Sequence, residues 1–89
     1  MRNVQRRTQL QRLAKIVNIL QSVACSKAEI IYRLEDIFEK QFSESQIEKD
    51  IFCLRMDFDA EITYNKTLDC YSINQEYDFK EALYKFVCL

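Results

Sequence analysis

The sequence predicts a small α+β domain, in which three helices are followed by a two-stranded β-hairpin and a final helix. Apolar residues recur at helical spacing in four segments, and the last three of these segments each begin with a capping pattern. Between the third and fourth segments, two short runs alternate apolar with polar residues around a polar turn. The 89 residues contain no Gly and no Pro, which favours long helices.

The first helix is expected to be well formed from Thr8 onward. Its apolar stripe is wide and consists of Leu10, Leu13, Ile16, Val17, Ile19, Leu20 and Val23. A stripe of this width is typical of a central core helix. The alternative is that part of it packs against a second subunit.

Residues 1–8 are expected to form a basic N-terminal arm ahead of a single domain at residues 9–89. Residues 1–15 contain five basic residues and no acidic residue, so the remaining 74 residues carry −6 in a chain of net charge −1. Arginines at a helix N-terminus oppose the helix dipole. The arm is therefore interpreted either as a phosphate-binding segment or as a solvated helix start.

A second helix is predicted from the capping box formed by Ser26 and Glu29. Its expected buried face consists of Ile30, Ile31, Leu34, Ile37 and Phe38. Residues 39–42 are expected to form the turn before the third helix, with Phe42 as a hydrophobic staple. Because this turn lacks the usual Gly, we expect a slightly longer connection.

The third helix is predicted at residues 44–57, after a capping box formed by Ser43 and Gln46. One face is apolar, with spacings of four, three and four between Ile47, Ile51, Leu54 and Phe58. The residues away from this face are expected to look outward, and they are Glu44, Ser45, Glu48, Lys49, Phe52 and Arg55.

Two charged residues of the third helix are expected to have structural partners. A negative charge inside this helix is expected to pair with a basic residue, and for Asp50 a candidate is Arg33. Arg55 lies further along the helix and is expected to pair with an acid such as Glu48 or Asp59.

The hairpin is predicted at residues 62–73, because apolar positions alternate at Ile62, Tyr64, Tyr71 and Ile73. A polar segment at residues 65–69 supplies the turn. The last helix starts at a third capping box, formed by Asp78 and Glu81. Its apolar residues are expected either to complete the core or to form a dimer contact, and they are Phe79, Ala82, Leu83, Phe86 and Val87.

Helices followed by a hairpin in this order are the plan of a winged helix-turn-helix domain. The third helix and the hairpin resemble the N-terminal DNA-binding domain of bacterial WYL-domain and DeoR-like transcriptional regulators. The family's recognition helix typically runs serine, any residue, arginine, threonine, isoleucine, any residue, arginine, aspartate. Here the matching positions are Ser43, Ile47 and Asp50, and Lys49 stands in for the second arginine.

The resemblance covers residues 9–74 and extends into the hairpin. Positions similar to the family's later leucine and to its wing are Leu54, Ala60, Ile62, Tyr64 and Tyr71. The chain departs from the family pattern at four positions. Ser45 and Gln46 replace the first arginine and the threonine, while Asp59 and Cys70 occupy positions usually held by glycine.

The resemblance implies a DNA-binding transcriptional regulator whose partner is double-stranded DNA. The expected recognition-helix contacts are Ser43, Ser45, Gln46 and Lys49, and the expected backbone contacts are Arg6, Arg7 and Lys66. The resemblance also implies a homodimer formed through the C-terminal helix. The alternative is a winged-helix protein-interaction module that has lost DNA binding, which fits the acids Glu44 and Glu48 and the aromatics Phe52 and Tyr84.

Composition argues against other kinds of chemistry. The chain has no His, no Gly-rich loop and four scattered Cys without a C-x-x-C pair, so neither an enzyme nor a metal or cofactor site is expected. No run is apolar enough to span a membrane. The basic N-terminus lacks the apolar stretch of a signal peptide, so a cytoplasmic protein with reduced thiols is expected.

Overall fold

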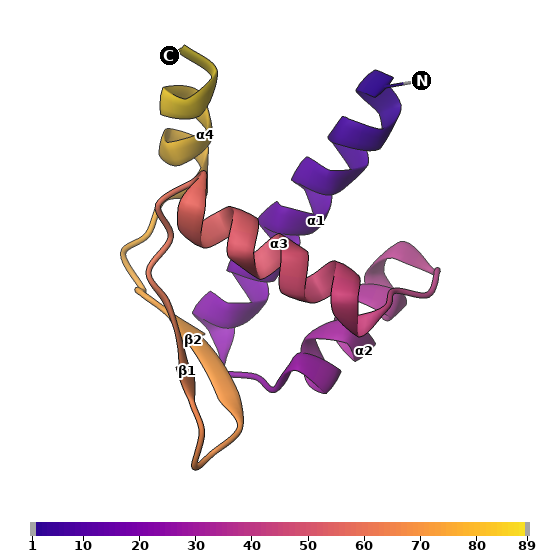
Figure 1. Ribbon diagram of the computed structural model, residues 1–89, viewed down its shortest axis with the longest axis vertical. Coiled ribbons are helices and arrows are strands. Elements are labelled where there is room, and N and C mark those ends of the chain that lie inside the picture. Colours follow the sequence, from indigo (N-terminus) through magenta and orange to yellow (C-terminus); the bar gives the residue numbers. More distant parts are fainter. Residues whose placement is uncertain (1, 89) are drawn as a thin grey trace.

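The computed structural model describes residues 2–88, with side chains from Thr8 onward. Within this range the predicted α+β fold class is confirmed (Figure 1). The elements are α1 (Arg2–Ser22), α2 (Lys27–Phe38), α3 (Glu44–Met56), β1 (Ile62–Asn65), β2 (Cys70–Ile73) and α4 (Phe79–Cys88). In Figure 1, α3 lies across α1 and α2, and the hairpin of β1 and β2 extends away from the helices. We call this hairpin the wing.

The core lies among α1, α2, α3 and the base of the wing. The three helices contact one another, and α1 and α3 also contact the strands. Each helix contributes apolar side chains that are completely buried, and these are Leu13 and Ile16, Ile30 and Leu34, and Ile47 and Leu54. Ile62 and Ile73, which face each other across the two strands, close the core on the wing side.

All three predicted helix caps are present. In each, the side-chain oxygen of the cap accepts a hydrogen bond from the backbone N–H three residues later. The pairs are Ser26 with Glu29 at 3.2 Å, Ser43 with Gln46 at 3.1 Å and Asp78 with Glu81 at 3.2 Å. Since such caps satisfy backbone N–H groups that have no partner inside the helix, they fix where α2, α3 and α4 begin.

Residues 2–8 are helical and continuous with the rest of α1. This segment contains Arg and Gln, which are good helix formers. Two expectations about buried apolar residues differ from the structure. Ile37 is 46% exposed because it lies in the last turn of α2, beside a shallow surface hollow. Val23 is 45% exposed because it follows the end of α1 and has left the helical stripe.

The turn between α2 and α3 is built without Gly. Glu39 adopts the left-handed conformation, with φ of 56°, and its N–H bonds the Glu35 carbonyl at 2.8 Å. The Glu35 carboxylate then accepts a hydrogen bond from the backbone N–H of Phe42 at 3.1 Å. Phe42 is buried next to Phe38, with ring centroids 5.9 Å apart, as expected of a residue that anchors the entry to α3.

The wing is attached to the helices at its second strand. Cys25, in the loop between α1 and α2, exchanges two backbone hydrogen bonds with Tyr71, at 3.1 and 2.7 Å.

Left-handed residues occur at Asp59, where the family pattern has glycine, and at Asp69, one residue before the second glycine position at Cys70. Asp69 therefore supplies a left-handed residue in the hairpin turn, and Asp59 supplies one in the loop between α3 and β1, both without Gly.

α4 is attached through aromatic contacts. The ring of Phe58 lies 5.3 Å from the ring of Phe79 and 4.8 Å from that of Phe86. Tyr77, just before the helix, donates to the Phe58 carbonyl at 2.5 Å, and its own carbonyl accepts from Gln21 at 2.6 Å. Among the described residues of α4, no side chain is fully buried.

Candidate nucleic-acid interface

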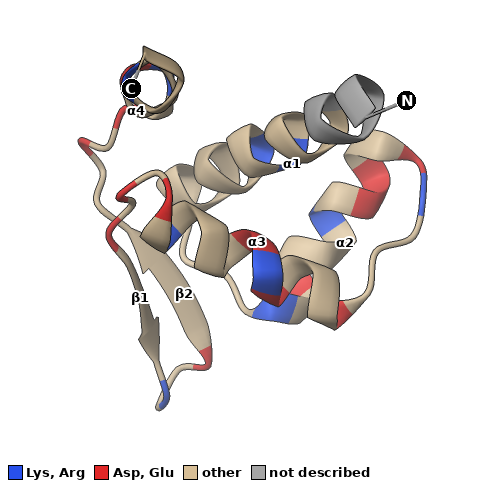
Figure 2. Cartoon of the chain, turned by 45° about the horizontal axis from the view of Figure 1, so that its top comes forward, with Lys and Arg blue, Asp and Glu red and all other residues tan. Residues whose placement is uncertain are grey.

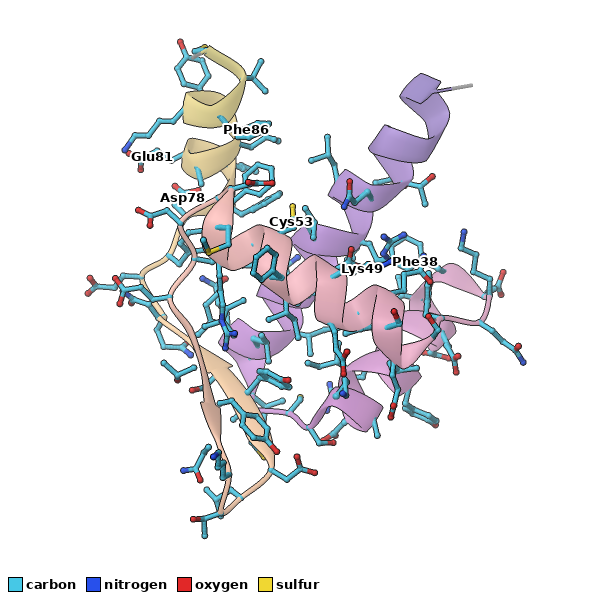
Figure 3. All side chains as sticks on the ribbon, in the orientation of Figure 1. Phe38, Lys49, Cys53, Asp78, Glu81 and Phe86 are labelled. Carbon is cyan, nitrogen blue, oxygen red and sulfur yellow. The ribbon has the colours of Figure 1, made fainter. Side chains whose placement is uncertain are left out.

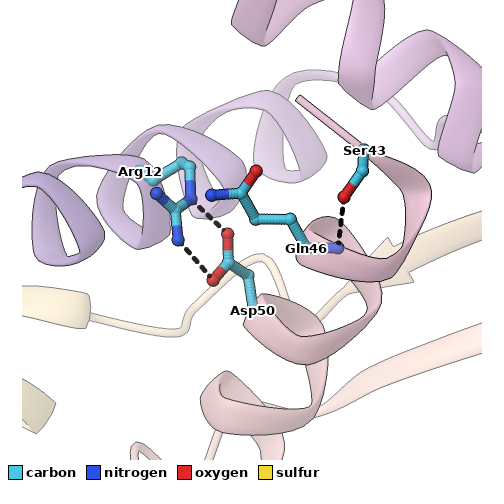
Figure 4. A network of polar contacts seen from close by, with 4 residues as sticks. All are labelled: Arg12, Ser43, Gln46 and Asp50. Carbon is cyan, nitrogen blue, oxygen red and sulfur yellow. Dashed lines mark hydrogen bonds and ion pairs between the residues drawn. The ribbon is translucent and has the colours of Figure 1, made fainter. Parts of the chain in front are cut away.

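A buried ion pair holds α3 against α1. Asp50 is 1% exposed and Arg12 is 8% exposed. The guanidinium donates twice, from Nε to Oδ2 at 2.5 Å and from Nη2 to Oδ1 at 3.0 Å (Figure 4). It also lies 5.7 Å from the centre of the Phe42 ring. A bidentate Arg–carboxylate pair fixes orientation as well as distance, so it sets how α3 is rotated.

This pair corrects the expected partner of Asp50. Arg33 pairs with Glu29 on the exposed side of α2, at 3.3 Å, and is not the partner of Asp50. The reason is that Asp50 lies on the inner face of α3 that packs on α1, where Arg12 is also buried.

The side of α3 opposite Asp50 forms an exposed ridge. Its residues follow one another at helical spacings of four, three and four, and they are Ser45, Lys49, Phe52 and Met56. All four are exposed, and Figure 3 shows Lys49 about midway along the helix. We call these four residues the outer ridge of α3. Its N-terminal half is polar, whereas its C-terminal half is apolar.

Two contacts on the flanks of the ridge tie α3 to its neighbours. Glu48 forms an ion pair with Lys27 at the start of α2, and this hydrogen bond raises the pKa of Lys27. Arg55 donates from Nε to the carbonyl of Ile62 in β1, at 2.9 Å. Arg55 therefore binds the wing, and the expectation that it pairs with Glu48 or Asp59 is wrong. This link sets the position of β1 relative to the outer ridge.

Three of the expected DNA contacts gather at the N-terminal half of α3. Ser43 is the cap, and its hydroxyl can still donate while it accepts from Gln46. Ser45 and Lys49 lie on the outer ridge. Gln46 is only half exposed, and its side chain points toward Arg12 and α1 (Figure 4), so it lies at the edge of this surface.

The other expected contacts lie apart from α3. Lys66 is exposed at the tip of the wing, where Figure 2 shows a basic residue at the end of the hairpin. Two side-chain oxygens accept hydrogen bonds at the tip. Asn65 Oδ1 accepts from the Leu68 N–H at 3.1 Å, and the Tyr64 hydroxyl donates to Asp69 at 2.5 Å. The side chains of Arg6 and Arg7 lie outside the described residues.

Sequence reasoning did not identify the role of Arg12, or the contact of Lys27. In the sequence, Arg12 is one of five basic residues in a basic segment. In the structure it is buried and forms an ion pair with Asp50. A signal was present, however. Asp50 interrupts the apolar face between Ile47 and Ile51, and a buried acid requires a buried base.

The thiols are suited to an apolar or structural role. The four cysteines, Cys25, Cys53, Cys70 and Cys88, are all free. Burial raises the pKa of Cys25, and burial together with the hydrogen bond to Asp57 raises the pKa of Cys53 to about 11. Both are therefore protonated at neutral pH and poor nucleophiles. Among residues 2–88 there is no group of three or more metal-ligating side chains.

None of the described helices is long and apolar enough to cross a membrane. Comparison with family models, with curated proteins and with solved structures gives no match to this chain. The proposed function therefore depends on the geometry of α3 and the wing.

Proposed function

We propose that this domain binds duplex DNA through α3 and the wing, as part of a cytoplasmic transcriptional regulator. The observation that carries the proposal is the outer ridge of α3, which presents Ser45 and Lys49 to solvent from a helix whose rotation is fixed by Arg12 and Asp50. In helix-turn-helix proteins the N-terminal residues of the second helix contact base edges in the major groove.

Each proposed contact has a chemical role. Lys49 donates to guanine O6 or N7, while the hydroxyls of Ser43 and Ser45 bind base edges or phosphates. Gln46 contributes from the edge of the surface. Phosphates are bound by Lys66 at the wing tip and by Arg6 and Arg7. Each neutralised phosphate makes the slope of log binding constant against log salt concentration steeper by about 0.9. The positive end of the α3 dipole is at the N-terminus of the helix, next to Ser43.

We further propose that two copies pair through α4, so that each presents one α3 to a half-site. α4 carries exposed apolar side chains, with Tyr84 71% and Val87 72% exposed. A groove of about 380 Å³ lies between α4 and α1, and Leu10, Leu83 and Phe86 line it. Pairing would cover these residues and double the number of phosphate contacts.

A protein-interaction module is the second candidate. The observation that favours it is the exposure of Phe52 and Met56 on α3, since aromatic residues and Met are enriched at protein interfaces. Glu44 at the start of the helix also opposes DNA. The ion pair between Glu48 and Lys27 is evidence against this second hypothesis, because it neutralises one of the two acidic residues beside the ridge.

The test is binding of a fluorescent random-sequence duplex, followed by anisotropy from low to physiological salt. We expect binding that weakens steeply with salt, and a loss of about tenfold or more for Lys49→Glu. The matched control is Lys15→Glu, which makes the same charge change at an exposed site on α1, outside the proposed DNA and dimer contacts, and should leave affinity within about twofold. Absence of duplex binding at low salt would reject the proposal in favour of the protein-interaction module.

A further inference from the structure

The C-terminal half of the outer ridge has no role inside the domain. Phe52 is 63% exposed and Met56 is 67% exposed. Neither residue belongs to the core or to the partly buried residues around it, and among the described residues Phe52 makes no ring contact. A solvent-facing Phe and Met one helical turn apart leave a continuous apolar strip on the surface that is proposed to face DNA.

The position of this strip relative to Lys49 determines what it can reach. Phe52 follows Lys49 by three residues, which is a rise of about 4.5 Å along the helix, and base pairs are stacked about 3.4 Å apart. A helix lying in the major groove with Lys49 at one base pair therefore brings Phe52 over the next one or two. Met56 extends the strip by one further turn.

The major groove offers one apolar group, the C5-methyl of thymine. Donors and acceptors on the other base edges would lose water against an aromatic ring without gaining a hydrogen bond. From the exposure of Phe52 and its place beside Lys49, we propose that Phe52 reads thymine methyl groups, with Met56 supporting it. The domain then prefers sites in which thymine lies one or two steps from the base pair contacted by Lys49. This inference rests on the DNA-binding function proposed above.

Charge favours DNA over a protein as the occupant of this strip. Lys49 is the charged residue of the outer ridge, and the N-terminal end of the helix adds a partial positive charge. Lys27 lies beside the ridge and neutralises Glu48. The apolar strip therefore adjoins Lys49 and the positive end of the helix dipole, which favour phosphate, whereas Glu44 at the helix start opposes it.

The experiment compares two duplexes of identical sequence, one containing thymine and one containing deoxyuridine, which lacks only the C5-methyl. Affinities are measured by anisotropy for the unaltered protein, for Phe52→Ala and for the control Tyr32→Ala, which truncates an exposed aromatic on α2. We expect the unaltered protein and Tyr32→Ala to bind the deoxyuridine duplex about fourfold more weakly for each methyl contacted. Phe52→Ala should bind both duplexes equally.

The outcomes separate this inference from the proposed function. Duplex binding with equal affinities of the unaltered protein for both duplexes would overturn the thymine inference and leave DNA binding in place. An unchanged preference for thymine in Phe52→Ala would also overturn it. If that variant also self-associates more weakly in sedimentation velocity, Phe52 contacts a second copy of the domain and not thymine. Absence of binding to either duplex would reject the proposed function, and the inference with it.

Discussion

α3 and α4 are both amphipathic helices with a capped start, yet the domain holds them very differently. α3 buries three apolar residues and Asp50, and it is tied to α1, α2 and the wing by charged side chains. Among the described residues, α4 has no fully buried side chain, and it packs against the ring of Phe58. An apolar face therefore shows only that a helix needs a partner. It does not show whether that partner lies within the same chain.

The largest expected effect is at the ion pair that fixes α3. Asp50→Ala leaves the Arg12 guanidinium buried without a partner, so we expect the free energy of unfolding to fall by about 3 to 5 kcal/mol. Urea unfolding followed by circular dichroism measures it. The control is Arg12→Met combined with Asp50→Leu, which removes both charges and should recover most of the loss. A loss below about 1 kcal/mol for Asp50→Ala would mean that the pair does not hold α3.

The next largest effect on stability is expected from matched Leu→Ala substitutions in the two helices. Leu54 is completely buried in α3, so Leu54→Ala should reduce stability by about 3 kcal/mol. Leu83 is only half-buried in α4, so the same substitution there should reduce stability by about 1 kcal/mol. Both values come from urea unfolding at equal protein concentration. Equal losses would show that α4 is held as firmly as α3, and that the two helices do not differ in this respect.

The smallest effect on folding is expected at the exposed end of α4. Val87→Asp should leave the unfolding midpoint of the monomer nearly unchanged, because Val87 is 72% exposed. If α4 pairs two copies, the same substitution should convert dimer to monomer in sedimentation velocity. Lys80→Asp is a control on the same helix. A dimer that survives Val87→Asp would place the contact elsewhere, with the wide stripe of α1 as the next surface to test.

The features that sequence predicts well are local ones. The caps at Ser26, Ser43 and Asp78 and the alternation in the wing each depend on residues a few positions apart, and all of them are confirmed.

The features that sequence misses depend on how helices are placed against each other. Asp50 and Arg12 are separated by 38 positions, and nothing local to Asp50 distinguishes Arg12 from Arg33 as its partner. Ile37 has the spacing of a buried residue, but it borders a surface hollow between α1 and α2 and is 46% exposed. The candidate site shows the same division. The exposure of Ser45, Lys49 and Phe52 follows from periodicity, whereas the link from Arg55 to the wing does not.

The attachment of the wing at both strands has a consequence for the thermodynamics of binding. β1 accepts a hydrogen bond from Arg55, and β2 exchanges two with Cys25, so the base of the hairpin is already ordered in the free domain. A partner that contacts the wing and α3 together would therefore lose little conformational entropy in ordering them. We expect the entropic penalty to come mainly from the exposed side chains at the tip, such as Lys66.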